Sequence, residues 1–232
     1  MRAEQSGGKD VLPVGRSKTQ ARTYYDRLAP FYRVLGGGFE RRPARTALGR
    51  LGVAAGETVL EVGCGPGEEM VEMARRVGPD GCVYGLDLSH RMLIGSRRRL
   101  AKAGLTDRSA LCRGDGAALP YAADSFDAVF LAFTLELFET EEIPAVLAEV
   151  ARVLRPTGRV GVVSLSREGR GSPVRRLYEW VHRRWPRLFD CRPIYVRRSV
   201  EQAGYTVAES EEGSMAGLPV EIVVGKKRAA GA

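Results

Sequence analysis

A short apolar run that leads into three closely spaced glycines limits the possible folds of this chain more than any other feature. The run is Thr58–Val62, and the glycines follow at Gly63, Gly65 and Gly67. Glycine can adopt positive φ angles and lets the backbone approach a ligand closely. A strand, such a turn and then a helix are typical of the first βα unit of a doubly wound sheet, where ligands bind. Taken alone, the motif also fits a generic βα turn.

Strands and helices alternate along the rest of the chain. Apolar runs predict strands at 58–62, 82–86, 109–113, 128–132, 159–165, 205–209 and 220–224, and helical periodicity predicts helices at 17–35, 39–51, 68–77, 89–103 and 141–154. Strands separated by helices form βαβ units with parallel strands, whereas the last two strands follow each other directly. We therefore predict an α/β fold: a Rossmann-like, doubly wound, mostly parallel seven-stranded sheet with an antiparallel edge strand, capped by N-terminal helices and a helical insert.

These elements set the expected organisation of the 232 residues. We expect a flexible tail over residues 1–16 and one domain over 17–232. Within the domain, the expected parts are N-terminal cap helices at 17–55, a ligand-binding core at 56–166, a cap insert at 167–200 and C-terminal edge strands at 201–232.

Composition excludes several classes of protein. Hydrophobic residues make up 44% of the chain and charged residues 28%, which is typical of a globular protein. No apolar stretch reaches the ~18 residues of a membrane span, and no apolar segment follows Met1, so a secretory signal is not expected. The four cysteines form no CxxC pair and the chain has two histidines, so we predict neither a metal site nor a disulfide framework. These features favour the cytoplasm.

The glycine turn favours one kind of ligand over another. A dinucleotide fingerprint reads GxGxxG, whereas the third glycine here comes one residue earlier. Glu68 and Glu69 then open the following helix, where the pyrophosphate of a dinucleotide would have to lie. Two carboxylates would repel a pyrophosphate but not a ligand that carries an amine and a sulfonium. The sequence thus argues against a nicotinamide-dependent oxidoreductase.

Acidic residues follow the next two strands. Asp87 ends the second strand, where a carboxylate can accept hydrogen bonds from both hydroxyls of a ribose. A role in capping the next helix is the alternative for Asp87. Asp115 ends the third strand between two glycines, where an acid can accept the amino group of an adenine.

In this order, the glycine turn and the two acids resemble class I S-adenosylmethionine-dependent methyltransferases over about residues 57–165. The resemblance implies S-adenosylmethionine as the cofactor. It implies that Glu61 and the three glycines surround the methionine part, that Asp87 holds the ribose, and that Met92 and Asp115 contact the adenine. Neighbours of these positions complete the expected cofactor site, namely Cys64, Leu88, Gly116 and Phe133.

Within that superfamily, the segment Tyr25–Tyr32 (YDRLAPFY) resembles the opening of the ubiquinone/menaquinone-biosynthesis C-methyltransferases. That family carries Phe-Gly-x-Arg-Asn after the fourth strand, whereas this chain reads Phe133-Thr134-Leu135-Glu136-Leu137. An acid, Glu136, thus replaces the arginine. We predict Glu136 at the mouth of the sheet as a general base. The alternatives are that it positions an ammonium substrate, or that it is a surface glutamate paired to an arginine.

Aromatic and histidine side chains outside the core are candidates for the substrate pocket: Tyr25, Tyr32, Tyr178 and His182. Packing within the core is the alternative for the two N-terminal tyrosines, and a solvent-exposed position on a lid helix is the alternative for His182.

The charge of +8 is unevenly distributed. Residues 1–55 and 167–200 each carry +7, whereas residues 56–166 between them carry −4. Two basic segments folded over the substrate side would suit a lipophilic or anionic substrate, or contact with an anionic membrane surface. A bias in codon usage toward arginine is the alternative. A nucleic-acid or protein substrate is not expected, because no Asn/Asp-Pro-Pro-aromatic motif follows the fourth strand.

The sequence thus favours an S-adenosylmethionine-dependent methyltransferase that acts on a small, lipophilic or aromatic, quinone-like molecule. A phospholipid-amine or natural-product N- or O-methyltransferase is the alternative, as is a non-catalytic protein that binds S-adenosylmethionine. The methyl acceptor and the oligomeric state stay open.

Overall fold

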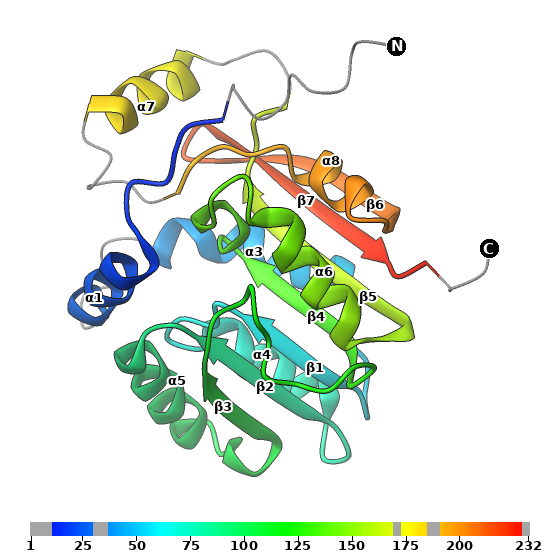
Figure 1. Ribbon diagram of the computed structural model, residues 1–232. Helices are drawn as coiled ribbons and strands as arrows, with labels where there is room; N and C mark the ends of the chain where they lie inside the picture. The colour runs from blue at the N-terminus through cyan, green and yellow to red at the C-terminus, as the bar shows by residue number, and fades with distance from the viewer. Residues whose placement is uncertain (1–10, 30–36, 169–172, 185–190, 229–232) are drawn as a thin grey trace.

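A single seven-stranded sheet organises the chain. The computed structural model describes residues 11–29, 37–168, 173–184 and 191–228 (Figure 1). The strands are β1 (Thr58–Val62), β2 (Cys82–Asp87), β3 (Ser109–Arg113), β4 (Phe126–Ala132), β5 (Leu154–Leu165), β6 (Thr206–Met215) and β7 (Leu218–Lys226). Their order is β3-β2-β1-β4-β5-β7-β6. Strands β1 to β5 are parallel, and β7 runs antiparallel to both of its neighbours, β5 and β6. The predicted fold is confirmed, with the antiparallel strand lying just inside the edge strand β6.

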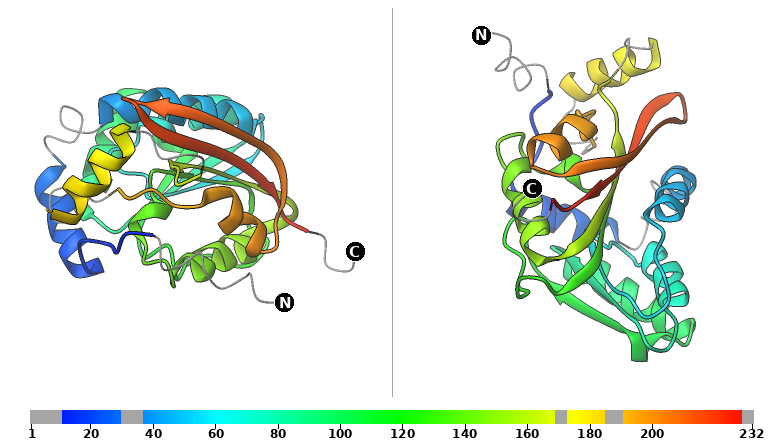
Figure 2. Two further views of the ribbon diagram at one scale, coloured as in Figure 1. Left: turned by 90° about the horizontal axis from the view of Figure 1, so that it is seen from above. Right: turned by 90° about the vertical axis from the view of Figure 1, so that its right-hand side faces the viewer.

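Helices cover both faces of the sheet (Figure 2). Helices α3 (Gly37–Leu51), α4 (Glu68–Val77) and α5 (His90–Lys102) pack on one face, and α6 (Ile143–Val153) and α8 (Val196–Gln202) pack on the other. Each layer has its own apolar core, and the central strands contribute to both, as with Phe130 on one side and Leu131 on the other. Parallel strands need this double cover because both of their faces are apolar.

The βα units form where local sequence and burial agree. Helix α4 buries Met70, Met73, Ala74 and Val77, which recur at helical spacing, and carries acids in its first turn and arginines in its last. Helix α5 begins after Ser89, whose hydroxyl accepts a hydrogen bond from the Met92 amide at 3.2 Å, as an N-cap residue does.

The N-terminal segment packs against the domain. Helix α1 (Lys18–Leu28) contacts α5, and the Asp26 carboxylate accepts hydrogen bonds from the Ser89 hydroxyl at 2.6 Å and the Arg91 amide at 3.1 Å. Residues 11–16, expected as part of a flexible tail, lie against the protein instead. Leu12 is buried, and its carbonyl accepts a hydrogen bond from Arg192 at 2.8 Å. The predicted helix to residue 35 ends at Leu28, and residues 30–36 lie outside the described part of the chain.

The C-terminal part departs from the prediction in two places. The expected cap insert divides, because α7 (Pro173–Arg184) lies at the surface whereas α8 buries Val196 and Val200 against the sheet. The edge hairpin is longer than its apolar runs suggested. Strand β6 is mostly exposed, so pairing with β7, rather than burial, sets its length. No helix in the described ranges is both long and apolar enough to cross a membrane.

The sheet core makes a direct prediction about stability. Phe130 on β4 is fully buried, so Phe130→Ala should lower the free energy of unfolding by about 3–5 kcal/mol through lost burial and the cavity it leaves. Phe39 on α3 is 68% exposed and serves as the matched control, so Phe39→Ala should change stability by less than about 0.5 kcal/mol. Urea unfolding of both variants tests this, and equal losses would contradict the packing described.

Candidate functional site

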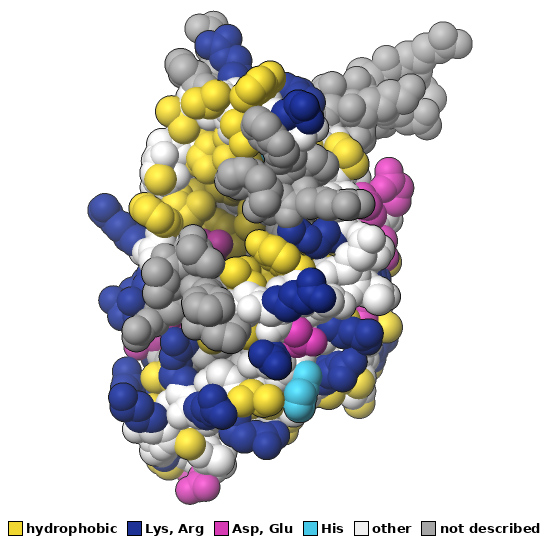
Figure 3. Space-filling model, turned by 90° about the vertical axis from the view of Figure 1, so that its left-hand side faces the viewer, with side chains coloured by type: hydrophobic (Ala, Val, Ile, Leu, Met, Phe, Trp, Pro, Cys, Tyr) yellow, Lys and Arg dark blue, Asp and Glu magenta, His cyan; other side chains and the backbone are white. Residues whose placement is uncertain are grey.

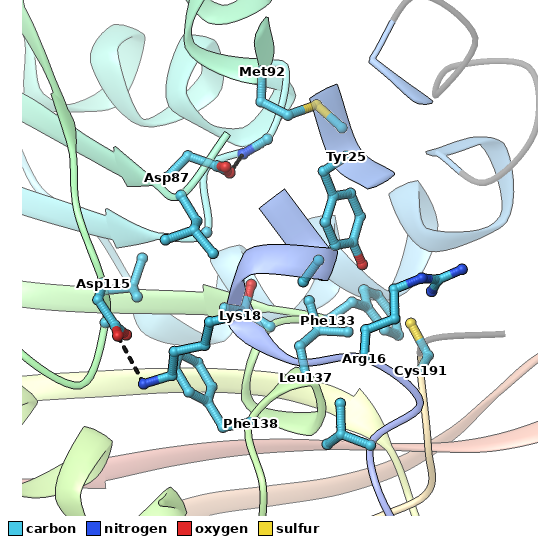
Figure 4. A pocket seen from close by; sticks show the side chains of 18 of the residues that line it. Arg16, Lys18, Tyr25, Asp87, Met92, Asp115, Phe133, Leu137, Phe138 and Cys191 are labelled. Carbon is cyan, nitrogen blue, oxygen red and sulfur yellow. Dashed lines mark hydrogen bonds and ion pairs between the residues drawn. The ribbon is translucent and has the colours of Figure 1, made fainter. Parts of the chain in front are cut away.

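A cavity of about 740 Å³ opens at the carboxyl ends of β1, β2 and β4, with α1 forming one of its walls (Figure 4). Most residues expected to bind a cofactor line it: Gly63, Gly65, Asp87, Leu88, Met92, Asp115, Gly116 and Phe133. Figure 4 shows Asp87 and Asp115 on one side and Arg16, Tyr25 and Cys191 on another. The structure thus brings together residues as far apart in the sequence as Arg16 and Cys191.

A much smaller cavity of about 40 Å³ adjoins the first behind the glycine turn. The expected residues Glu61 and Cys64 line it, together with Glu40, which lines both cavities. Gly67 lines neither. It has a φ of 76°, and a Cβ atom there would lie 2.8 Å from the Ser96 hydroxyl, so Gly67 serves close packing between α4 and α5.

The glycine turn needs glycine for two different reasons. At Gly63, φ is 73° and a Cβ atom would lie 2.3 Å from the Thr134 hydroxyl. At Gly65, φ is 49° but nothing lies within 4 Å of an added Cβ. Gly63 therefore allows the turn to approach the loop after β4, and Gly65 leaves space on the cavity side.

Asp87 connects the ends of the first two strands. One of its oxygens accepts the Gly65 amide at 2.9 Å, and the other accepts the Ser89 amide at 2.8 Å. Burial raises the pKa of Asp87 to about 6. Each carboxylate oxygen can accept more than one hydrogen bond, so Asp87 remains able to accept ribose hydroxyls.

Glu61 provides the test of whether S-adenosylmethionine fits this site. Its side chain is 1% exposed, and Oε2 has no hydrogen-bond partner among the described residues. Burial, with Glu69 and Asp87 nearby, raises its pKa well above the ordinary range. A buried, unpaired carboxyl among acids suits a ligand with an amine and a sulfonium and disfavours a pyrophosphate. The residues present therefore fit the methyl-donor cofactor.

Asp115 has an ionic partner that the sequence did not indicate. Lys18, in the first turn of α1, lies 2.7 Å from Asp115 and 2.7 Å from Glu142. The backbone amide of Ala117 donates to the other Asp115 oxygen at 3.0 Å. Lys18 thus holds α1 across the part of the cavity where the resemblance places the adenine.

The opposite wall of the cavity is largely apolar. Helix α1 contributes Tyr25 and Leu28, the loop after β4 contributes Leu137 and Phe138, and α7 contributes Tyr178. Phe133 begins that loop with a φ of 49°, an uncommon conformation outside glycine that often marks functional sites. Tyr25 and Tyr178, which the sequence suggests for a substrate pocket, line this cavity, and Tyr32 lies outside the described residues.

Glu136 and His182 do not line either cavity. Glu136 is fully buried in the short 3₁₀ turn after β4, and neither carboxylate oxygen has a hydrogen-bond partner among the described residues. His182 is 1% exposed and faces inward from α7. Glu136 thus lies behind the cavity wall, rather than at the mouth of the sheet as predicted, and makes no contact with the cavity space.

Sequence reasoning missed several polar residues that line the cavity, including Arg16, Lys18, Glu40, Glu139 and Glu142. They come from the segment before α1, from α1 and α3, and from the loop before α6, and no local motif marks them. Only the folded chain brings them to the carboxyl edge of the sheet.

The buried state of Glu136 predicts a pH dependence of stability. Burial raises its pKa from 4.5 to about 8. Between these two pKa values, the Glu136 carboxyl is protonated in the folded state and ionised in the unfolded state. The stability that the proton provides is therefore complete below about pH 4.5 and is lost as the pH rises through about 8. Glu136→Gln removes this titration, so the variant should gain stability relative to the parent protein between pH 5 and pH 8.

Chemical denaturation at several pH values measures this difference. Asp80→Asn, at an exposed position, is the matched control and should keep the pH profile of the parent protein. Parallel pH profiles for Glu136→Gln and the parent protein would show that Glu136 is not held protonated.

Comparisons with known proteins agree with this geometry. Residues 59–158 match a family described as "Methyltransferase domain". The chain is 40% identical over 138 residues to a nocamycin O-methyltransferase from Saccharothrix syringae, which covers 60% of this chain and 48% of that protein. It is 37% identical over 117 residues to a demethylmenaquinone methyltransferase from Lactobacillus johnsonii, with 50% and 47% covered.

The matched regions thus span about half the length of these curated relatives. Among solved structures, the [4+2]-cyclase SpnF has a TM-score of 0.75 at 20% identity, with 97% of this chain and 100% of that chain covered, which shows a shared fold. Three observations support S-adenosylmethionine as the cofactor: the glycine turn, the acids that follow β2 and β3, and the family match over residues 59–158. Residues 59–158 therefore match the methyltransferase domain family, and the chain shares its fold with a solved S-adenosylmethionine-dependent methyltransferase from Aquifex aeolicus at a TM-score of 0.60 and 24% identity, with 79% of this chain and 89% of that chain covered.

Proposed function

We propose that this protein transfers a methyl group from S-adenosylmethionine to a small, lipophilic, aromatic or quinone-like acceptor. The observation that carries the proposal is a cavity with an apolar wall under α1 and α7 that adjoins a smaller, acidic cavity behind the glycine turn. The fold alone does not support this proposal, because a [4+2]-cyclase shares it.

The acidic end suits the cofactor. Asp87 would accept the ribose hydroxyls, and Glu61 and Glu69 would balance positive charge beside the glycine turn. When bound, S-adenosylmethionine supplies an electrophilic methyl group on a sulfonium. A site that is negative around this cation stabilises its binding electrostatically.

The apolar end suits the acceptor. The whole cavity, at about 740 Å³, is in the range of small-molecule sites, which are roughly 300–1,000 Å³. Tyr25, Phe133, Leu137 and Tyr178 would enclose an aromatic ring and exclude water. By their names, one curated relative is an O-methyltransferase of nocamycin and the other a methyltransferase of demethylmenaquinone. An acceptor with a phenol or enol group fits the same apolar wall.

In the proposed reaction, the protein contributes more by aligning the cofactor and the acceptor than by transferring a proton. Glu136 makes no contact with the cavity, so it would act as a base only after a rearrangement. Glu40 is the acid that lines both cavities, beside the glycine turn and Phe133. Holding two reactants in line accounts for a large share of the rate in methyl transfer, because it replaces a bimolecular encounter.

Asp87 tests the cofactor end. Asp87→Ala should weaken binding of S-adenosylhomocysteine by about 1–3 kcal/mol, roughly 5- to 150-fold, because buried hydroxyls lose their acceptor. Asp107→Ala, at an exposed position, should leave the affinity unchanged. Titration calorimetry measures the affinity of both variants. In the parent protein, NAD(H) should bind far more weakly than S-adenosylmethionine or S-adenosylhomocysteine. Tight NAD(H) binding without any S-adenosylmethionine signal would refute the assignment.

Leu137 tests the acceptor end. Labelled S-adenosylmethionine and a panel of acceptors should give a labelled product with lipophilic phenols or hydroquinones, and none with transfer RNA or histone peptides. With the preferred acceptor, Leu137→Ser should raise KM about 10-fold, since burial of a leucine contributes about 1.5–3 kcal/mol. The affinity of the Leu137→Ser variant for S-adenosylhomocysteine should not change. Labelling of transfer RNA or histone peptides, without labelling of any small molecule, would contradict the proposed acceptor class.

A further inference from the structure

Helix α7 has an unusual distribution of side chains. Its buried positions carry charged and polar residues, namely Arg175, Glu179 and His182, whereas its large apolar side chains face solvent. A helix that packs on a domain normally buries its apolar side chains instead. This arrangement calls for an explanation beyond the stability of the domain.

The inward face of α7 is held by polar contacts. Arg167 lies 2.7 Å from the Glu179 carboxylate, and Arg175 donates to the backbone carbonyls of Arg167 and Glu168 at 3.0 Å each. The Tyr178 hydroxyl donates to the Cys191 carbonyl. These contacts fix the orientation of the helix, so the outward face is a defined surface.

The outward face joins apolar and basic side chains. Val174, Leu177 and Trp180 are 44%, 62% and 56% exposed and follow one another at intervals of three residues. Arg176 and Arg183 are exposed beside them. We call these five residues the α7 patch. Figure 3 shows one side of the whole molecule, where hydrophobic side chains gather around a hollow in the upper part and Lys and Arg side chains lie around them.

We propose that the α7 patch docks on an anionic lipid surface. A short helix with leucine and tryptophan on one side and arginines beside them is typical of segments that lie in the membrane interface. Tryptophan is favoured there because its ring is apolar and its N–H can still meet water. The arginines would pair with lipid phosphates, and each basic residue near an anionic surface adds to the attraction.

Charge distinguishes this partner from a second copy of the chain. Helix α7 carries four arginines and one glutamate. A symmetric dimer through the patch would set this positive helix against itself, and like charges would oppose association. An anionic bilayer supplies the opposite charge along the whole face.

Docking would also serve the proposed function. Tyr178 lies on the same helix and lines the cavity, so a docked α7 would bring the apolar wall of the cavity close to the lipid. An acceptor dissolved in the bilayer would then have a short path to the cavity. This consequence rests on the proposed function, whereas docking itself does not.

Vesicle binding tests the proposal without any methyl acceptor. Vesicles of phosphatidylglycerol and phosphatidylcholine should pellet the protein at low salt, vesicles of phosphatidylcholine alone should pellet much less, and high salt should release it. Leu177→Ser combined with Trp180→Ser should reduce the bound fraction about 10-fold or more. Arg176→Gln combined with Arg183→Gln should reduce binding to the anionic vesicles only. Arg97→Gln combined with Arg98→Gln removes the same charge from exposed positions on α5 and should have little effect.

Tryptophan fluorescence gives a second measurement. The chain has two tryptophans, so Trp185→Phe leaves Trp180 as the sole reporter. Its emission should shift to shorter wavelength when anionic vesicles are added. S-adenosylhomocysteine binding by each variant confirms that it is folded. The proposal would be overturned if the α5 control lost as much vesicle binding as the α7 variants, or if the Trp180 emission did not shift. It would also be overturned if size-exclusion chromatography showed self-association that the α7 variants abolish.

Discussion

The hydrogen bond from the Gly65 amide to the Asp87 carboxylate is the contact on which the rest of the site depends. It joins the turn after β1 to the end of β2, two neighbouring parallel strands. The other Asp87 oxygen accepts the Ser89 amide, and the Ser89 hydroxyl caps α5 and donates to Asp26 on α1. One carboxylate thus begins a chain of contacts that runs from the glycine turn to the N-terminal helix, and this chain fixes one side of the cavity.

Electrostatics separates the two ends of the cavity. Glu61, Glu69 and Asp87 are crowded and buried around the glycine turn, and burial raises the pKa of each of them. A cation bound there would relieve both the desolvation and the mutual repulsion of these acids. At the opposite end, α1 and α7 supply aromatic and aliphatic side chains, while their basic residues lie outside or pair with acids, as Lys18 pairs with Asp115 and Glu142. The basic N-terminal segment and the acidic core of the sequence therefore meet in ion pairs at the cavity.

The parts of the fold with strong local signals were predictable from the sequence. The strand at Thr58–Val62, the helix after Gly67 and the helix that Ser89 caps formed where they were expected, because glycine conformation, burial and capping act over a few residues. Long-range packing decided the rest. Leu12 is buried by contacts with the rest of the protein, β6 extends because β7 pairs with it, and Glu136 turns into the core rather than toward the cavity. Likewise, α8 joins the core and α7 reverses the usual orientation of its apolar side chains, which helical periodicity alone does not reveal.

A crystal structure with S-adenosylhomocysteine bound tests the central claim most directly, because the claim concerns where each part of the ligand lies. The account predicts ribose hydroxyls within hydrogen-bond distance of Asp87, the amino group on the side of Glu61, and the sulfur directed toward the wall formed by Tyr25, Phe133 and Leu137. A ligand bound in the reverse direction, with its adenine at Glu61, would contradict the account, as would a ligand bound outside the cavity.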